Sequence, residues 1–190
     1  MKNRDVLLVI DMQNVYMPGG EWCCPSMPAA VRNTKKLIDS ETIGTVLFTQ
    51  YIAPEDPAGR WAVYNSEYRA INEDAFQCDM IDDMKPYLTD ENLIIKSTYS
   101  SLTVEAIREA VLKADHVLLS GVVSECCVLA TLMQAIDLGA HVVYLTDCTA
   151  GQSDENEMMV RRIAELFSPM HCIVTDSDGY LAMVSEGRQN

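Results

Sequence analysis

The chain has 190 residues, of which 48% are hydrophobic and 22% charged, an ordinary composition for a soluble globular protein. Its formal net charge of −14 argues against a nucleic-acid partner, because binding to phosphate groups requires a basic surface. A chain of this length can bury a substantial core, so we expect one domain spanning residues 1–190.

No apolar run approaches the length of a membrane span, and the first residues lack the long apolar stretch of a secretory signal. The seven cysteines are an odd number, and they show neither a Cys-x-x-Cys motif nor the Cys/His spacing of a zinc site. We therefore expect reduced thiols, a cytoplasmic location and no contact with a membrane.

Apolar runs of strand length recur along the chain, rich in Val, Ile and Leu and with little polar alternation. This pattern is typical of strands that are covered on both faces. The predicted strands are residues 5–10, 45–49, 92–95, 116–120, 141–146 and 172–175.

Helical segments separate most of these strands. Pro28 stands near the first turn of one, and Gly139 follows another at the position that commonly ends a helix. The alternation of strands and helices predicts a parallel sheet with right-handed crossovers. The predicted helices are residues 28–40, 101–114, 125–138, 154–166 and 177–184.

Residues 50–90 form the one long stretch that we predict to be irregular, and residues 16–28 form a second loop that could cover a site. Long connections of this kind are often lids or binding loops. Trp61 and Tyr64 in the longer stretch are the best candidates for a substrate pocket. The alternative, equally favoured, is that these aromatic side chains pack the lid or a subunit interface.

Three polar residues stand where predicted strands end. Asp11 follows the first strand, Lys96 follows the third, and Cys127 lies shortly after the fourth. Ligands of open parallel sheets bind along the edge where the carboxyl ends of the strands gather. The three side chains can therefore meet in one site that holds an acid or base, a cation and a thiol, which are the groups that covalent amide hydrolysis needs.

Cys127 would lie at the third position of a helix that Ser124 caps. Unpaired backbone N–H groups and the helix dipole would favour its thiolate there, although Glu125 would oppose this if it pointed inward. The adjacent Cys126 would point elsewhere on the helix. The alternative is that Cys127 is a small buried hydrophobe, as free cysteines usually are.

Asp11 could take the thiol proton and later pass it to a leaving amine. Lys96 would hold the two anions together. Taken alone, Asp11 could equally cap a loop, and an isolated lysine at a strand end is more often simply solvated. Each histidine begins a predicted strand, and we interpret all of them as structural: His116, His141 and His171.

Three segments carry recognisable motifs in a fixed order. Residues 11–16 read Asp-Met-Gln-Asn-Val-Tyr, residues 96–102 read Lys-Ser-Thr-Tyr-Ser-Ser-Leu, and residues 121–131 read Gly-Val-Val-Ser-Glu-Cys-Cys-Val-Leu-Ala-Thr. They resemble the Asp-x-Gln-x-x-Phe, Lys-x-x-x-Ser-x-Phe and Gly-Val-x-Thr-x-x-Cys-Val-x-x-Thr motifs of the isochorismatase-like cysteine hydrolases. This family includes nicotinamidases, carbamoylsarcosine and ureidoacrylate amidohydrolases, and isochorismatase itself. The resemblance spans nearly the whole chain.

The resemblance implies an α/β fold of three layers, in which helices flank a six-stranded parallel sheet of order 3-2-1-4-5-6. It implies a catalytic triad of Asp11, Lys96 and Cys127. It also implies a cis peptide between Val122 and Val123, and an oxyanion hole formed by the backbone N–H groups of Val123 and Cys127. Family members are commonly homo-oligomers, so we expect a dimer or a larger assembly.

The chain departs from the family motifs in ways that bear on its substrate. Tyr16 and Leu102 replace two phenylalanines, so the pocket wall is expected to differ. We expect Trp61 and Tyr64 to line the pocket, with Gln13 and Tyr16 behind them.

Nicotinamidases carry an Asp-x-His…His metal site after the second strand. Residues 49–54 here read Thr-Gln-Tyr-Ile-Ala-Pro, and no histidine precedes His116. We therefore expect no metal and no cofactor, and nicotinamide becomes a poor candidate substrate. Isochorismatase cleaves a vinyl ether and lacks the nucleophilic cysteine, so the presence of Cys127 favours hydrolysis of a C–N bond.

The sequence thus predicts a metal-free cysteine hydrolase that cleaves a small amide, ureido or carbamoyl compound through a Cys127 thioester. Two alternatives stay open. One is isochorismatase-type or other non-amide hydrolysis in the same pocket, and the other is a catalytically silent binding protein of this fold.

Overall fold

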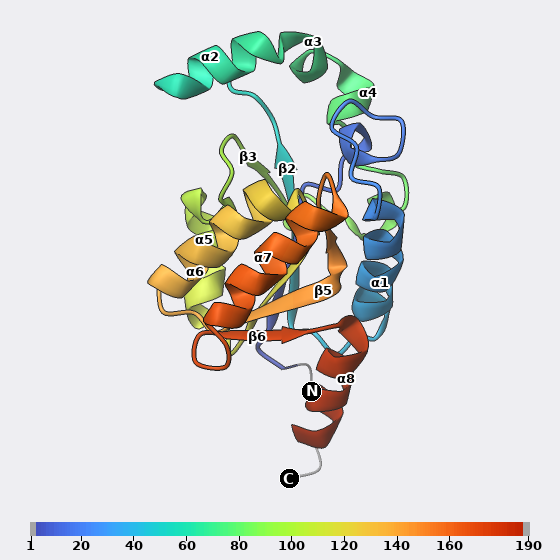
Figure 1. Ribbon diagram of the computed structural model, residues 1–190, viewed down its shortest axis with the longest axis vertical. Coiled ribbons are helices and arrows are strands. Elements are labelled where there is room, and N and C mark those ends of the chain that lie inside the picture. The colour runs from blue at the N-terminus through green and yellow to red at the C-terminus, as the bar shows by residue number, and fades with distance from the viewer. Residues whose placement is uncertain (1–2, 188–190) are drawn as a thin grey trace.

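The computed structural model describes residues 3–187, which form a sheet between two layers of helices (Figure 1). In this part of the chain the sheet has six strands in the order β3-β2-β1-β4-β5-β6, and every neighbouring pair is parallel. The α/β class and the strand order that the family resemblance implies are therefore confirmed. The strands are β1 (Val6–Ile10), β2 (Thr45–Tyr51), β3 (Leu93–Lys96), β4 (Val117–Val122), β5 (Val142–Ala150) and β6 (Cys172–Thr175).

The central strand β1 is apolar along its whole length because both of its faces are covered. Leu7 and Val9 belong to one hydrophobic core, whereas Leu8 and Ile10 belong to the other, as the two-residue period of a strand requires. All of these side chains are buried. The unbroken apolar run therefore marks a strand between two helical layers.

Two groups of helices supply the two cores. Helices α1 (Met27–Asp39) and α8 (Ser177–Gly187) contribute to the core on one face of the sheet. Helices α5 (Glu105–Lys113), α6 (Leu129–Asp137) and α7 (Asp154–Leu166) contribute to the core on the other face. No helix among residues 3–187 is long and apolar enough to cross a membrane.

Helix α7 illustrates how the sequence sets a helix boundary. The hydroxyl of Ser153 accepts a hydrogen bond from the backbone N–H of Asn156 at 3.2 Å, which satisfies one of the unpaired donors of the first turn. Asp154, Glu155 and Glu157 in that turn complement the positive end of the helix dipole. The predicted bounds of this helix match the observed ones.

Two predicted helices each begin with a separate turn. The 3₁₀ turn η3 (Ser101–Thr103) precedes α5, and the single-turn π-helix η4 (Ser124–Val128) precedes α6. Thr131 joins the two turns, because its hydroxyl donates to Cys127 O at 2.7 Å and accepts from the Ser101 N–H at 3.0 Å. These two hydrogen bonds tie the segment that carries Cys127 to the turn that begins at Ser101.

The stretch of residues 50–90 contains helices, so the prediction that it is irregular was wrong. After β2, the helices α2 (Arg60–Glu67), α3 (Arg69–Asn72) and α4 (Ala75–Cys78) form an arc above the carboxyl edge of the sheet (Figure 1). We call residues 60–78 the lid. Pro54, Pro57 and Gly59 stand before the lid, and α2 begins directly after Gly59, whose φ is 56°.

Candidate active site

Asp11, Lys96 and Cys127 meet at the carboxyl edge of the sheet. Asp11 directly follows β1, Lys96 ends β3, and Cys127 lies in η4 just after β4. The Nζ atom of Lys96 is 2.6 Å from Asp11 Oδ2 and 3.4 Å from Cys127 Sγ, and all three residues are buried. The structure thus brings together the three side chains that the sequence placed at separate strand ends.

Asp11 turns into the site through an unusual backbone conformation. Its φ of 51° is in the left-handed region, which few residues other than Gly, Asn and Asp adopt. The Asp11 N–H donates to Thr49 O at 3.1 Å, and the Thr49 hydroxyl donates to Asp11 Oδ1 at 2.7 Å. Thr49 therefore fixes both the backbone and the carboxylate, and the second oxygen faces Lys96.

Lys96 is held by backbone carbonyls as well as by Asp11. Its ammonium group donates to Thr98 O at 2.8 Å and to Tyr99 O at 3.1 Å. Burial lowers the pKa of Lys96, but the Asp11 carboxylate and Cys127 raise it, and the net shift is upward. Lys96 therefore stays an ammonium ion and offsets the charge of Asp11.

Cys127 is not placed as the helix-end interpretation predicted. Val123, and not Ser124, is the residue at the N-cap of η4, so Cys127 is its fourth residue. Burial and the Asp11 carboxylate raise the pKa of the Cys127 thiol, and Lys96 opposes this only in part. The resting thiol is therefore protonated and needs a base before it can act as a nucleophile.

The backbone between β4 and η4 is tightly constrained. Gly121 has a φ of 108°, and a Cβ atom on it would lie 2.0 Å from Ile10 O, so only glycine fits beside β1 at this point. The peptide bond between Val122 and Val123 is cis. The Val123 N–H has no hydrogen-bond acceptor within residues 3–187. It is therefore a donor that remains free beside Cys127.

A cavity of about 230 Å³ reaches Cys127. Of the predicted pocket residues, Tyr16 and Tyr64 line it, whereas Gln13 and Trp61 do not. Val123, the expected oxyanion donor, also lines it. The full lining is Tyr16, Trp22, Tyr64, Tyr68, Tyr99, Val123, Cys126, Cys127 and Gln152.

Gln13 holds the lid instead of lining the cavity. Its Nε2 atom donates to Tyr51 O at 3.0 Å and to Cys78 O at 2.6 Å, and its Oε1 atom accepts from the Tyr51 N–H at 2.9 Å. Gln50 Nε2 donates to the same Cys78 carbonyl at 2.8 Å. Because both ends of its amide are occupied, Gln13 joins β2 to the end of α4.

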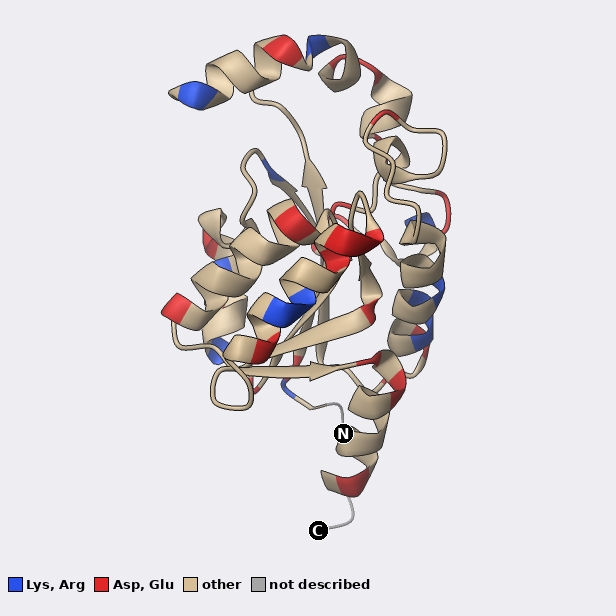
Figure 2. Ribbon diagram, viewed as in Figure 1, with Lys and Arg blue, Asp and Glu red and all other residues tan. Residues whose placement is uncertain are grey.

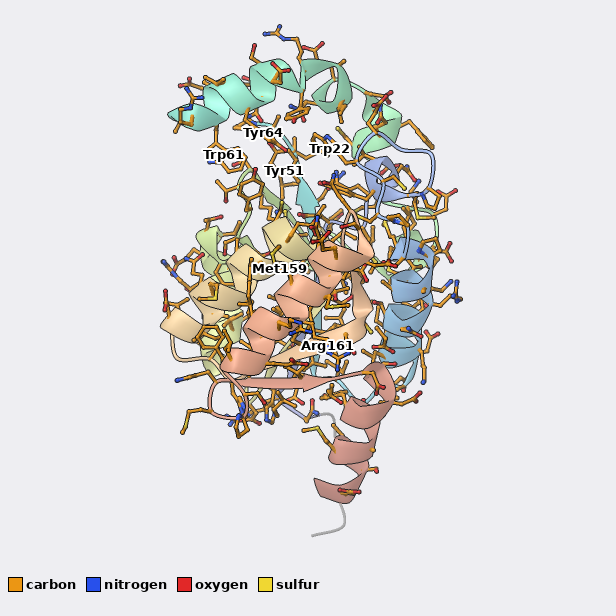
Figure 3. The ribbon with its side chains drawn as sticks, in the orientation of Figure 1. Trp22, Tyr51, Trp61, Tyr64, Met159 and Arg161 are labelled. Carbon is orange, nitrogen blue, oxygen red and sulfur yellow. The ribbon has the colours of Figure 1, made fainter. Side chains whose placement is uncertain are left out.

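Trp61 packs behind the cavity wall. Its ring centroid is 5.3 Å from that of Tyr64, 4.8 Å from that of Tyr99 and 6.4 Å from that of Tyr51. Figure 3 shows Trp61, Tyr64, Tyr51 and Trp22 gathered between the lid and the edge of the sheet. Tyr64 thus lines the cavity, whereas Trp61 packs against the rings of Tyr51, Tyr64 and Tyr99.

Five lining residues were not predicted to be in the pocket. Trp22 and Tyr68 lie in the two stretches that were expected to cover a site, so their aromatic character was a usable signal. The sequence offers no such signal for Gln152, which lies between β5 and α7. The five residues are Trp22, Tyr68, Tyr99, Cys126 and Gln152.

Glu125 does not point at Cys127. Its Oε1 atom accepts hydrogen bonds from the backbone N–H of Gln152 at 3.1 Å and from Asn156 Nδ2 at 2.6 Å. The carboxylate therefore faces the start of α7, behind the wall of the cavity that Gln152 forms.

The histidines lie at the opposite edge of the sheet, in line with their structural interpretation. His116 Nδ1 is 3.0 Å from Asp5 Oδ1, and both residues directly precede strands. The ring of His141 is 5.0 Å from that of His116. None of them lines the cavity.

Comparison with known proteins identifies the family of the chain. The family model described as the isochorismatase domain matches residues 5–178. The chain belongs to the isochorismatase domain family. Membership of this family places the protein among the isochorismatase-like hydrolases.

Solved structures share the isochorismatase-like fold at low identity. An isochorismatase-like hydrolase from Alkaliphilus metalliredigens is 21% identical with a TM-score of 0.75, over 96% of this chain and 99% of the other. A cysteine hydrolase from Pseudomonas syringae pv. phaseolicola 1448A is 18% identical with a TM-score of 0.76, over 96% and 93%. A pyrazinamidase/nicotinamidase from Streptococcus mutans UA159 is 20% identical with a TM-score of 0.68, over 90% and 99%. A search of curated proteins found no match.

Proposed function

We propose that the protein is a cysteine hydrolase that cleaves a C–N bond of a small amide, ureido or carbamoyl compound. The observation that carries this proposal is the position of the Lys96 ammonium, 2.6 Å from the Asp11 carboxylate and 3.4 Å from the Cys127 sulfur. The cation thus contacts both the base and the thiol, and the thiol lies at the wall of a cavity. This is the arrangement that an activated nucleophile requires.

In the first half of the reaction, Asp11 takes the proton of Cys127 as the sulfur attacks the carbonyl carbon. Because burial and the Asp11 carboxylate raise the pKa of the Cys127 thiol, the sulfur needs a base for this step. Lys96 stays charged and offsets the negative charge that moves between sulfur and carboxylate. The N–H groups of Val123 and Cys127 are the proposed donors to the oxyanion.

The tetrahedral intermediate then breaks its C–N bond. Asp11 gives its proton to the departing nitrogen, which leaves as ammonia or an amine, and a thioester remains on Cys127. Water attacks the thioester while Asp11 accepts its proton. The C–S bond breaks, the acid product leaves, and the proton returns to Cys127, so the enzyme is regenerated.

The cavity volume supports a small substrate. At about 230 Å³, it is below the ~300–1,000 Å³ that is usual for pockets that bind drug-sized molecules. Tyr64 and Tyr68 of the lid and Gln152 line this space beside the sulfur, so a substrate with few atoms on either side of the scissile bond would fit best.

Substitution of the two neighbouring cysteines tests the proposal. Ammonia release from a panel of small amides, ureas and carbamates should be abolished by Cys127→Ala and largely retained by Cys126→Ala, which removes a thiol at the wall of the same cavity. Loss of activity in Cys126→Ala with retention in Cys127→Ala would show that the nucleophile has been assigned to the wrong thiol. Retention in both variants would favour non-amide or cysteine-independent chemistry.

A further inference from the structure

The cavity beside Cys127 is walled mainly by aromatic rings. Tyr16 and Trp22 have ring centroids 5.8 Å apart, Trp22 and Tyr68 5.3 Å, and Tyr68 and Tyr64 4.8 Å, so the rings form a continuous wall. Tyr99 extends it, 6.3 Å from Tyr64. Because burial raises the pKa of Tyr16, Tyr64 and Tyr99, these phenols are uncharged at neutral pH.

Among residues 3–187, no lysine or arginine lines the cavity. The ammonium of Lys96 is fully buried and faces Asp11, whose charge it offsets. The two arginines of the lid, Arg60 and Arg69, are exposed and are not part of the lining. The cavity therefore offers no free cation with which to bind a carboxylate, phosphate or sulfonate.

Two carboxylates lie directly behind the wall at Gln152. Glu125 Oε1 accepts from the Gln152 N–H at 3.1 Å, and Glu157 Oε1 accepts from the Gly151 N–H at 2.9 Å. A Cβ atom on Gly151 would lie 2.6 Å from Glu125 Oε2 and 3.1 Å from Glu157 Cγ. Both acidic side chains therefore converge on the peptide that precedes the cavity wall.

Neither carboxylate is neutralised by a direct ion pair in the described part of the chain, although Arg161 borders the same hollow as Glu157. Within residues 3–187, neither Glu125 nor Glu157 forms an ion pair. The Oε2 atom of Glu125 is buried and has no hydrogen-bond partner in that part of the chain. Figure 2 shows acidic residues at the start of α7, on the same edge of the sheet as the lid.

The charge of Glu125 acts on a thiol at the cavity wall. The pKa of the Cys126 thiol, which lines the cavity, is raised by burial and then by Glu125. The pKa of Cys24, which is buried in the same loop as Trp22, is raised by burial first and by Glu125 next. A cation at the aromatic wall would feel the same carboxylate as an attraction.

We propose that the natural substrate is a cationic amide, whose quaternary or N-alkylated ammonium group rests against the aromatic wall beside Trp22 and Gln152 while its carbonyl reaches Cys127. That the substrate is an amide rests on the proposed function, whereas its positive charge is inferred from the cavity wall alone. Ring faces attract such a cation, and the unpaired carboxylates of Glu125 and Glu157 add to the attraction. An anionic substrate would be repelled by the same carboxylates and would find no lysine or arginine side chain among the described lining residues to offset its charge.

Three amides of similar shape that differ in charge test the proposal. They are trimethylammonioacetamide (+1), its uncharged isostere 3,3-dimethylbutanamide and the anionic sulfoacetamide. Binding to the Cys127→Ala protein is measured by isothermal titration calorimetry, so that no hydrolysis intervenes. We expect the cation to bind about tenfold more tightly than its uncharged isostere, and the anion more weakly than either. Equal binding of the cation and its isostere, or tighter binding of the anion, would overturn the proposal.

Matched variants in the Cys127→Ala background locate the source of the preference. Glu125→Gln keeps the hydrogen-bond acceptor for Gln152 but removes the charge, and it should reduce the preference for the cation several-fold. Trp22→Phe keeps a ring and should retain most of the preference, whereas Trp22→Leu should lose more. If the preference is unchanged by both Glu125→Gln and Trp22→Leu, the cavity is not the binding site and the proposal fails.

The proposed function can fail separately from this inference. If the Cys127→Ala protein prefers the cation but the wild-type protein releases ammonia from none of the amides tested, the charge preference stands and amide hydrolysis does not. If the wild-type protein hydrolyses the uncharged or anionic amide with the higher kcat/KM, amide hydrolysis stands and the cationic substrate class is wrong.

Discussion

The carboxylate of Asp11 lies 2.6 Å from the ammonium of Lys96, and neither side chain has any exposed surface. A pair of this kind is held by its surroundings, because each charge would be costly to bury without the other. Here Thr49 holds the carboxylate, and the carbonyls of Thr98 and Tyr99 hold the ammonium. The pair is therefore both a structural element and the proposed acid–base apparatus.

Removal of Lys96 should cost stability as well as activity. In Lys96→Met the Asp11 carboxylate loses its buried partner, and we expect the free energy of unfolding to fall by about 3–5 kcal/mol. Urea denaturation monitored by circular dichroism measures this. Lys35→Met is a suitable control, because it removes the partially exposed pair with Asp83, which should cost at most about 1 kcal/mol. Equal losses in the two variants would contradict the buried-pair interpretation.

Asp11→Asn should separate thiol reactivity from catalysis. The Asp11 carboxylate raises the pKa of Cys127 while Lys96 lowers it, so replacing the carboxylate with an amide should lower the thiol pKa. Alkylation of Cys127 by iodoacetamide at pH 8 should then be faster than in the wild-type protein. Hydrolysis should fall by about 10²- to 10⁴-fold, because the general base is gone.

The alkylation rates are best compared in a Cys126→Ala background, so that iodoacetamide can react with only one thiol at the cavity wall, that of Cys127. The account would be contradicted if alkylation and hydrolysis fell together, because Asp11 would then serve only to generate the thiolate. In the wild-type protein, the alkylation rate should keep rising as the pH increases above neutrality, without a plateau near pH 7.

Gly121→Ala should disrupt the junction between β1 and β4. The added Cβ would lie 2.0 Å from Ile10 O, and the φ of 108° is strained for alanine. We expect a loss of about 3 kcal/mol or more in unfolding free energy, from steric overlap and backbone strain together. Gly139→Ala also has a positive φ, of 84°, but meets no atom within 4 Å, so it should cost only about 1 kcal/mol. Chemical denaturation of both variants measures the two losses of unfolding free energy. A larger loss for Gly121→Ala would show that the close approach of Gly121 to β1 causes the difference.

The His116–Asp5 pair should make stability depend on pH at the edge of the sheet away from the cavity. The hydrogen bond and charge of Asp5 raise the pKa of His116. Burial raises the pKa of Asp5, but the hydrogen bonds from His116 and Tyr180 lower it by more than burial raises it. The net shift of the Asp5 pKa is therefore downward.

A raised histidine pKa contributes stability that is complete below the histidine pKa of the unfolded chain and is lost as pH rises through the folded value. A lowered aspartate pKa contributes stability that is present above the unfolded aspartate pKa and is lost as pH falls through the folded value. The pair should therefore be most stabilising in weakly acidic solution, between the two groups' unfolded pKa values. His116→Gln should flatten the decline of the melting temperature as pH rises from 6 to 8. An unchanged decline would show that other groups cause it.

Local patterns in the sequence were enough to predict the strands and the positions of the three central residues. Each strand is a short apolar run, and Asp11, Lys96 and Cys127 stand where such runs end. The order of the strands needed the family resemblance, because an apolar run shows that a strand is covered on both faces but not which strands are its neighbours.

The lid could not be predicted from local signals, because tertiary contacts decide its conformation. Its short helices depend on caps and tethers such as Asp74, whose side chain accepts from the backbone at the start of α4, and Gln13, which binds the carbonyl of Cys78. Gln13 next to the triad looked like a pocket residue, but only the structure shows that its amide is occupied. Gln152 and Tyr99 reach the cavity from loops distant in the sequence. The homo-oligomeric state implied by the resemblance stays a prediction.

The covalent intermediate on Cys127 is the most direct test of the account. The wild-type protein is mixed with a panel of small amides, quenched in acid within seconds, digested and analysed by mass spectrometry. We predict an acyl group on the peptide that contains Cys126 and Cys127, assigned by fragmentation to Cys127 and absent from Cys127→Ala. Turnover of an amide by Cys127→Ala, or an acyl group assigned to any other residue during turnover, would contradict the proposed mechanism.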